Sequence, residues 1–343
     1  MKKLLNTLFV ISPDTYLALE KENVVIYQDE TVLRRIPLLT LENILYFGYK
    51  GASPALMGAC AERNIGLCFL RPGGRFLARV CGASHGNVLL RKEQYRISDN
   101  SEAACQYAKN FIAGKIYNSR SVIKRALRDH PLSVDKDKLD FIANELMHSV
   151  RIARVCSDLD ELRGIEGNSA KLYFSVFQQL ILNDKTTFAF AGRVKRPPGD
   201  AVNAMLSFVY VLLAHDCASA LECVGLDSYV GFLHADRPGR QSLALDLMEE
   251  LRSVYADRFI LFLINNRMMK ANCFDYRENG SVYLNDDGRK IVLAEWQKRK
   301  QDTITHPFLN EKIQWGLVPY AQALLLARCI RGDLEEYPAF LWK

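Results

Sequence analysis

The chain has 343 residues, of which 49% are hydrophobic and 24% charged, and it carries a formal net charge of +6. This length is enough for two domains with cores of their own or for one large domain. The composition is typical of a globular protein, and no apolar run reaches the roughly 18 residues that a membrane-spanning helix needs. We therefore expect a protein that acts without insertion in a membrane.

Nine cysteines are scattered through apolar stretches of the sequence. An odd number of cysteines argues against a disulfide framework, and the lack of any C-x-x-C pair argues against a structural zinc cluster. We interpret them as reduced and mostly buried thiols, which places the protein in the cytoplasm.

Residues 1–95 have the pattern of short strands. Runs rich in β-branched and aromatic residues alternate with polar pairs at Glu22–Asn23 and Asp29–Glu30, which are typical of hairpin turns. A later pair, Gly73–Gly74, predicts the turn of a further hairpin. Strands of this length and spacing indicate a small β-sandwich.

One helix is predicted to interrupt these strands. It covers 53–65, with Ser53 as the capping residue and Pro54 at the first helical position. The sequence after the last predicted strand is polar and rich in turn-forming residues. It predicts a linker between two domains, which we place at 96–103.

From Ser101 onward, apolar residues recur at intervals of three and four, as they do on amphipathic helices. A single late hairpin is predicted with Asp287–Gly288 as its turn. The predicted fold class is therefore α+β. A small N-terminal β-sandwich-like domain, residues 1–95, precedes a larger, mostly α-helical domain, residues 104–343.

Basic residues gather at 114–128, 192–198 and 298–300, and the first of these runs holds five basic residues and no acidic one. Tyr117 and Trp296 lie among them. Basic clusters interleaved with aromatic residues are expected where a protein follows a phosphate backbone. Solvated helix faces explain most basic runs, so both interpretations stay open.

The stretch GFLHADRPGRQSLALDLMEELR, 231–252, places a histidine before a turn and three acids on the helix that follows. Asp246, Glu249 and Glu250 share roughly one helical face, because they lie three or four residues apart. Like charges at this spacing repel, and a bound cation reverses the repulsion. The stretch is either an ordinary solvated helix behind a loop or half of a metal site, with His234 as a further ligand.

The segment GIEGN, 164–168, places Glu166 between two glycines in an otherwise helical stretch. Each glycine there costs about 1 kcal/mol relative to alanine, a cost often found where a ligand comes close. A helix kink is the alternative. With His234, Asp246 and Glu249, Glu166 would complete an oxygen-rich site with one imidazole, which suits Mg²⁺ or Mn²⁺. A zinc hydrolase stays open, although no H-E-x-x-H motif is present.

Three segments together carry a family resemblance. GIEGNSAKLYF, RPPGDAVNAMLSFVYVLL and GFLHADRPGRQSLALDLMEELR, in this order, resemble the CRISPR adaptation integrase, the first CRISPR-associated protein. SPDTYLALEKENVVIYQ and SPALMGACAERNIGLCFL extend the likeness over nearly the whole chain. The branch that it is most similar to occurs in subtype one-C systems.

The resemblance implies an N-terminal β-domain used for dimerisation and partner contacts, a helical catalytic domain, a homodimer, and Mg²⁺ or Mn²⁺ as cofactor. Matched by position, the metal ligands are Glu166, His234 and Glu249, and Asp246 is a second catalytic acid near the metal. The spacing after His234 leaves open whether Asp246, Glu249 or Glu250 contacts the ion.

The implied activity is that of a DNA integrase and endonuclease. The 3′-hydroxyl of a short DNA fragment attacks a phosphodiester of the CRISPR array, a transesterification that needs no ATP, and the sequence has no phosphate-binding loop of the G-x-x-x-x-G-K-[ST] type. The implied partners are double-stranded and branched DNA and the small second CRISPR-associated protein. The residues expected to contact DNA are Lys115, Arg120, Arg196, Tyr210, Arg240 and Arg252.

Two other functions remain open on the sequence. A non-catalytic nucleic-acid-binding protein would explain the basic clusters but not the acids near a histidine. A metallohydrolase acting on a substrate other than nucleic acid would explain the acids but would bind DNA with little dependence on salt.

Overall fold

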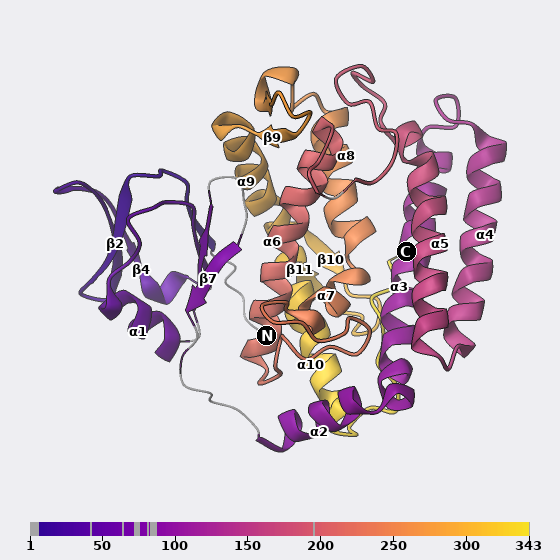
Figure 1. Ribbon diagram of the computed structural model, residues 1–343, viewed down its shortest axis with the longest axis horizontal. Helices are drawn as coiled ribbons and strands as arrows, with labels where there is room; N and C mark the ends of the chain where they lie inside the picture. Colours follow the sequence, from indigo (N-terminus) through magenta and orange to yellow (C-terminus); the bar gives the residue numbers. More distant parts are fainter. Residues whose placement is uncertain are drawn as a thin grey trace. The chain divides into compact units, whose positions relative to one another are not determined.

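The structure is a computed structural model that describes residues 7–41, 43–63, 65–71, 76–80, 82, 88–194 and 196–342. The chain divides into two compact units (Figure 1). The first comprises residues 1–85 together with 285–301, and the second comprises 86–284 together with 302–343.

Two sheets build the first unit. A mixed sheet has the strand order β1-β5-β6-β7, in which β7 alone is antiparallel to its neighbour; the strands are Thr7–Val10, Asn43–Tyr46, Gly66–Leu70 and Phe76–Val80. An antiparallel sheet has the order β2-β3-β4, with strands Thr15–Glu20, Asn23–Gln28 and Thr31–Pro37. Side chains from both sheets, including Leu17 and Ile44, meet in one buried core. The predicted sandwich-like β-domain is confirmed.

Local turn chemistry sets the hairpins of this unit. Lys21 and Glu22 have φ angles of 43° and 65°, and Asp29 has 52°. Left-handed backbone at such positions matches the right-handed twist of paired strands, so these turns favour tight hairpins. The predicted turn Asp29–Glu30 joins β3 to β4. The turn that joins β2 to β3 is Lys21–Glu22, one residue before the predicted pair Glu22–Asn23. The third predicted turn, Gly73–Gly74, lies outside the described residues.

Helix α1, Pro54–Glu62, begins where the sequence predicts. The Ser53 hydroxyl accepts a hydrogen bond from the Leu56 amide, and Pro54 takes the first helical position, where its missing N–H needs no partner. Leu56 and Cys60 are buried in the core that the two sheets share.

The second unit is mainly helical. In chain order its longer helices are α2 Val88–Asp99, α3 Ser101–Asp129, α4 Lys136–Val155, α5 Leu159–Val176, α6 Ala201–Cys223, α7 Ser242–Glu249, α8 Arg258–Asn265 and α10 Val318–Ile330. Helices α3, α4 and α5 lie side by side (Figure 1), and α6 packs against α7, α8 and α10. A π-helical turn, Arg252–Asp257, joins α7 to α8. Short strands form the pairs β8 Phe274–Tyr276 with β9 Val282–Leu284 and β10 Thr303–Thr305 with β11 Lys312–Gln314.

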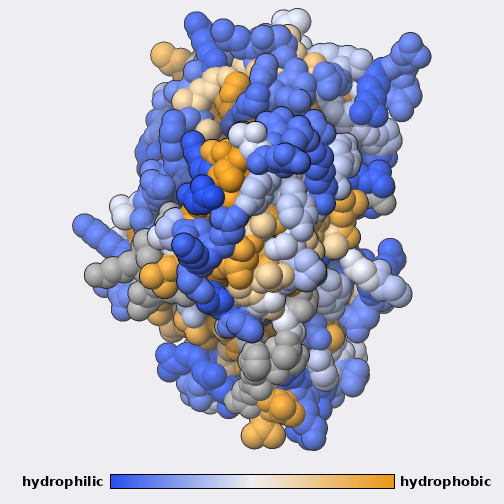
Figure 2. Space-filling model, turned by 90° about the vertical axis from the view of Figure 1, so that its left-hand side faces the viewer, coloured by the Kyte–Doolittle hydropathy of each residue, from blue (hydrophilic) through white to orange (hydrophobic). Residues whose placement is uncertain are grey.

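Helix α6 is the one helix in the described part of the chain that is long and apolar enough to cross a membrane, and 72% of its apolar window is buried inside the protein. It therefore has the character of a core helix. On the face drawn in Figure 2, hydrophilic residues predominate and hydrophobic patches are scattered among them.

Two sequence predictions need correction. The linker predicted at 96–103 is helical: α2 continues to Asp99, and the Asn100 side chain accepts hydrogen bonds from two amides to begin α3. The hairpin predicted at Asp287–Gly288 is wrong, because these residues open helix α9, Asp286–Gln301. Asn285 caps that helix by accepting from the Gly288 amide at 2.9 Å, so a local cap overrides the turn signal.

Candidate active site

Helix α7 is buried on all sides. Its apolar stripe, which includes Leu243 and Leu247, is inaccessible to solvent, and the acids Asp246, Glu249 and Glu250 are only 0%, 2% and 0% exposed. A buried carboxylate needs charge partners or hydrogen-bond donors. The solvated helix face that the sequence left open is therefore excluded.

Asp246 holds the loop that precedes α7. Its carboxylate accepts backbone N–H groups of Phe232, Leu233 and His234 at 2.6, 3.0 and 3.1 Å, and lies 2.6 Å from Nδ1 of His234. Gly231 makes this approach possible, because a Cβ there would stand 2.9 Å from the carboxylate. Both oxygens of Asp246 are thus committed to the loop.

The Asp246 pair also fixes the orientation of the His234 ring. A carboxylate at Nδ1 favours the tautomer that carries its proton there, which leaves the lone pair on Nε2. The His234 side chain is 27% exposed, whereas that of Asp246 is fully buried. His234 is therefore presented as a ligand or a proton acceptor through Nε2, with Asp246 as its support.

Glu249 has two cationic partners. Nζ of Lys115 lies 2.6 Å from one of its oxygens, and the Arg252 guanidinium lies 3.0 Å from the other. Burial by itself raises the pKa of Glu249, but the charges of Arg252, Lys115 and His234 outweigh it and lower the pKa to about 2. Glu249 is thus an ionised carboxylate held among positive charges.

Glu166 reaches the same lysine from helix α5, where it forms an ion pair with Nζ of Lys115. The helix runs unbroken through Gly164 and Gly167, and a Cβ at either glycine would meet nothing within 4 Å. The two glycines therefore do not interrupt the helix, and the helix surface beside Glu166 is open. One turn earlier, Arg163 donates to the Leu233 carbonyl at 2.8 Å and ties α5 to the loop of His234.

Glu250 is directed elsewhere. Its carboxylate accepts hydrogen bonds from Gln322, from the Tyr337 hydroxyl and from the Phe340 amide, at 2.9, 2.5 and 2.6 Å. Burial raises its pKa to about 7 despite these donors. Of the adjacent acids Glu249 and Glu250, only Glu249 shares the Lys115 ammonium group with Glu166.

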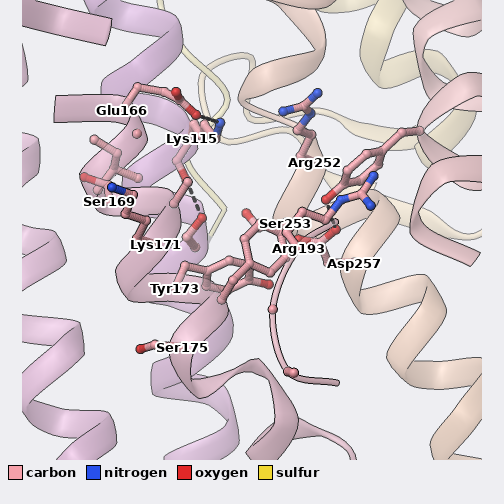
Figure 3. A pocket seen from close by; sticks show the side chains of 18 residues that line it. Lys115, Glu166, Ser169, Lys171, Tyr173, Ser175, Arg193, Arg252, Ser253 and Asp257 are labelled. Atoms are coloured by element: carbon pink, nitrogen blue, oxygen red, sulfur yellow. Dashed lines mark hydrogen bonds and ion pairs between the residues drawn. The ribbon is translucent and has the colours of Figure 1, made fainter. Parts of the chain in front are cut away.

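A cavity of about 410 Å³ opens beside this cluster, with Lys115, Glu166 and Arg252 in its wall. Figure 3 shows Glu166 and Lys115 together, with Arg252, Arg193 and Asp257 across the cavity from them. The hydroxyl groups of Ser169 and Ser253 are buried in its lining, with no hydrogen-bond partner among the described residues. The cavity thus combines cations, hydroxyl groups and a pair of carboxylates.

Tyr210 lies between two cations at the cavity wall. The guanidinium carbons of Arg252 and Arg193 lie 4.8 and 5.4 Å from its ring centre, and its hydroxyl donates to Asp257 at 2.6 Å. Burial raises the pKa of Asp257 to about 6, against the Tyr210 and Tyr173 hydroxyls, which lower it. Arg193 lies in the basic run 192–198 but was not among the residues expected to contact DNA, and no local motif marks Asp257.

The residues predicted to contact DNA fall into different surroundings. Arg196 is exposed and Arg120 is half-buried. Arg240 donates to the Ala235 carbonyl and closes the loop before α7. Lys115 is buried, with its ammonium group between carboxylates, so in this conformation it is not a surface contact.

The site contains donor groups of the kind that divalent metal ions bind. Among the described residues no three histidine, cysteine, aspartate or glutamate side chains are gathered closely enough to hold one. Glu166 and Glu249 nevertheless converge on one cation, the Lys115 ammonium. Two carboxylates with an imidazole nearby are the kinds of donor that Mg²⁺ or Mn²⁺ binds, so the donor types fit such an ion, although Lys115 lies between the two carboxylates here.

The chain matches the family model of CRISPR associated protein Cas1 over residues 8–298. CRISPR-associated endonuclease Cas1 2 of Rhodospirillum rubrum is 50% identical over 351 aligned positions. CRISPR-associated endonuclease Cas1 1 of Chlorobaculum tepidum is 48% identical over 343. Each alignment covers 100% of both proteins.

Solved structures share the fold. A casposase bound to an integration product superposes with a TM-score of 0.84 at 22% identity, covering 99% of this chain and 95% of that one. A chain of a Cas6-RT-Cas1–Cas2 complex gives a TM-score of 0.81 at 21% identity, covering 100% of this chain and 36% of that one. At such identities the likeness establishes the fold alone.

Proposed function

Because the chain belongs to the Cas1 family of CRISPR-associated proteins, we propose that it is a DNA integrase and endonuclease that inserts short DNA fragments into a CRISPR array. The 3′-hydroxyl of a fragment loses its proton and attacks the phosphorus of a phosphodiester in the array. A new P–O bond forms, the P–O bond to the array strand's own 3′-oxygen breaks, and this oxygen takes up a proton and leaves as a free 3′-hydroxyl. The observation that supports this chemistry best is the pair Glu166 and Glu249, which converge on one cation at the wall of a cavity lined by arginines.

The proposed cofactor is Mg²⁺ or Mn²⁺, held by Glu166, Glu249 and Nε2 of His234. When bound, such an ion supplies a Lewis acid for phosphodiester exchange. The single imidazole among the ligands favours Mn²⁺ over Mg²⁺. Asp246 would act through His234, because its own oxygens are already taken by the loop and by the ring.

The chain's own residues supply the rest of the reaction. Arg252 and Arg193 place positive charge along the cavity, where the phosphate being exchanged gathers negative charge. The Ser169 and Ser253 hydroxyls offer hydrogen bonds to its oxygens. Asp246, which holds the ring through Nδ1, would keep the lone pair of Nε2 of His234 directed toward the ion.

The proposed partners are double-stranded and branched DNA, a second copy of the chain and the small second CRISPR-associated protein, Cas2. Two strand transfers on opposite strands call for two active sites, which a two-fold dimer supplies. The first, β-rich unit would form the dimer and partner contacts. We place the reaction in the cytoplasm, where the array and the incoming DNA lie.

Strand transfer tests this function directly. A labelled DNA fragment is incubated with a plasmid that bears a CRISPR array, with Cas2 and Mn²⁺. We expect Glu166→Gln and His234→Ala to lower the transfer rate by at least about 100-fold, as loss of a metal ligand does. Glu161→Gln, on the same helix but exposed, is the matched control and should retain the wild-type rate.

Each alternative has its own outcome. Full transfer by a folded Glu166→Gln variant would contradict the proposed site. Tight DNA binding by the wild type without metal-dependent turnover on any linear or branched DNA would favour the non-catalytic nucleic-acid-binding protein.

A further inference from the structure

Lys115 is the residue that the proposed reaction leaves unexplained. It lies inside helix α3 and is 9% exposed, and its ammonium group forms ion pairs with both Glu166 and Glu249. The two carboxylates that converge on it are the two expected to hold the divalent ion. The lysine thus stands between the proposed ligands.

The helix around Lys115 is fixed in place. A Cβ at Gly114 would stand 3.0 Å from that of Ala339 and 3.2 Å from that of Glu250, so α3 packs closely on both. Asn118, nearly one turn further on, donates to the carbonyls of Glu250 and Phe340 at 2.6 Å each. The lysine backbone therefore cannot shift, and only its side chain is able to leave the carboxylates.

The charge balance requires one cation to leave. Glu166 and Glu249 carry two negative charges, and Lys115 and Arg252 already supply two positive ones. A divalent ion between the carboxylates would meet strong repulsion from an ammonium group at the same oxygens. Arg252 is held by its contact with the Tyr210 ring, whereas a lysine is a compact charge on a flexible stem.

We propose that Lys115 is a built-in competitor of the divalent ion. In the metal-free protein its ammonium group holds Glu166 and Glu249 together, and metal binding displaces it into the adjoining cavity, whose wall it already forms. The inference rests on the metal site of the proposed function. It makes Lys115 a positioning residue that sets metal affinity, and not itself a ligand.

The test measures Mn²⁺ binding to the full chain without DNA, by isothermal titration calorimetry and by the electron paramagnetic resonance signal of free Mn²⁺. Lys115→Met removes the competing charge, so we expect Mn²⁺ to bind at least about tenfold more tightly than to the wild type. Lys115→Arg keeps a charge that holds carboxylates more firmly, so we expect weaker binding than in the wild type.

Metal-free stability gives a second readout. Lys115→Met should melt below the wild type without metal, because the carboxylates lose their shared partner, and the gap should close at saturating Mn²⁺. Lys124→Met is the matched control: it lies on the same helix, is exposed, and pairs with Asp140 away from the site. It should leave Mn²⁺ affinity unchanged.

Equal or weaker Mn²⁺ binding by a folded Lys115→Met, or equal or tighter binding by Lys115→Arg, would overturn the competitor role. The metal site itself is tested separately by Glu166→Gln and Glu249→Gln. If these leave the wild-type Mn²⁺ affinity unchanged, the proposed metal site fails whatever the lysine variants do. If no variant binds Mn²⁺, the site and the inference are both overturned.

Discussion

Four hydrogen bonds to one carboxylate set the geometry of His234. Asp246 takes three backbone amides and the imidazole Nδ1, and it is paired with the ring before any ligand arrives. Glu249 is prepared in another way, by cations that lower its pKa to about 2 against the effect of burial. At the scale of the residue, contacts within the protein orient His234 and keep Glu249 ionised.

The buried carboxyl group of Asp257 should make the stability of the protein depend on pH. Burial raises its pKa from 3.8 to about 6, although the hydroxyls of Tyr210 and Tyr173 lower it. The folded state therefore binds more protons than the unfolded state within this window, so the free energy of unfolding falls as pH rises through it. Relative to Asp257→Asn, the wild type should lose about 2 kcal/mol of its free energy of unfolding between pH 4 and pH 6.

Urea unfolding of both proteins across this pH range measures the difference. Asp140→Asn, at an exposed position of α4, is the control and should follow the wild type. Parallel curves for wild type and Asp257→Asn would show that the buried carboxyl does not change its proton affinity on folding.

At the scale of the element, hydrogen bonds from the C-terminal segment, residues 337–342, connect helix α3 to the end of helix α7. Asn118 of α3 donates to the carbonyls of Glu250 and Phe340 and accepts from the Trp342 amide, while Glu250 accepts from Tyr337 and Phe340. The Trp342 ring lies 4.0 Å from the guanidinium carbon of Arg258. Glu250 therefore has a structural role next to a residue with a proposed catalytic one.

Asn118→Ala tests this fastening. The substitution leaves buried carbonyl and amide groups of α7 and the C-terminal segment without partners, so the free energy of unfolding should fall by about 3 kcal/mol. Mn²⁺ affinity should also fall, because α3 and the end of α7 are then no longer held at a fixed relative position. Asn144→Ala, exposed on α4, should change neither quantity. Wild-type stability for Asn118→Ala would mean that the segment docks independently of α3.

At the scale of the whole molecule, the positions of the basic residues determine which of them are able to attract DNA. The net charge of +6 is modest. Three cationic residues nevertheless line the same cavity: Lys115, Arg193 and Arg252. Several of these cations are partly neutralised by carboxylates. Long-range attraction for DNA must therefore come mainly from exposed residues such as Arg196.

The salt dependence of DNA binding follows from this division. The logarithm of the association constant should fall linearly with the logarithm of the salt concentration, and Arg196→Ala should reduce the slope by about 0.9 if one phosphate contact is lost. Fluorescence anisotropy with a duplex of fixed length measures both slopes, with exposed Lys136→Ala on the far helix α4 as the control. A wild-type affinity for DNA that does not change with salt concentration would instead favour a metallohydrolase that acts on another substrate.

The sequence alone determined what depends on neighbours in the chain. Ser53 and Pro54 set the start of α1, the polar pairs set the first hairpins, and three motifs were sufficient for the family. His234 and Asp246 also belong here, because only a short loop separates them. The same local reasoning failed at Asp287–Gly288, where a capping asparagine and a hairpin turn compete for one dipeptide.

Only the tertiary structure decided how the charges are partnered. Lys115 and Glu166 are 51 residues apart, and Asn118 and Phe340 are 222 apart. Whether a lysine faces DNA or carboxylates, and whether Glu249 or Glu250 points toward the site, depends on helices that pack from distant parts of the chain. Burial then makes the choice costly to reverse, because an unpaired charge away from water is strongly destabilising.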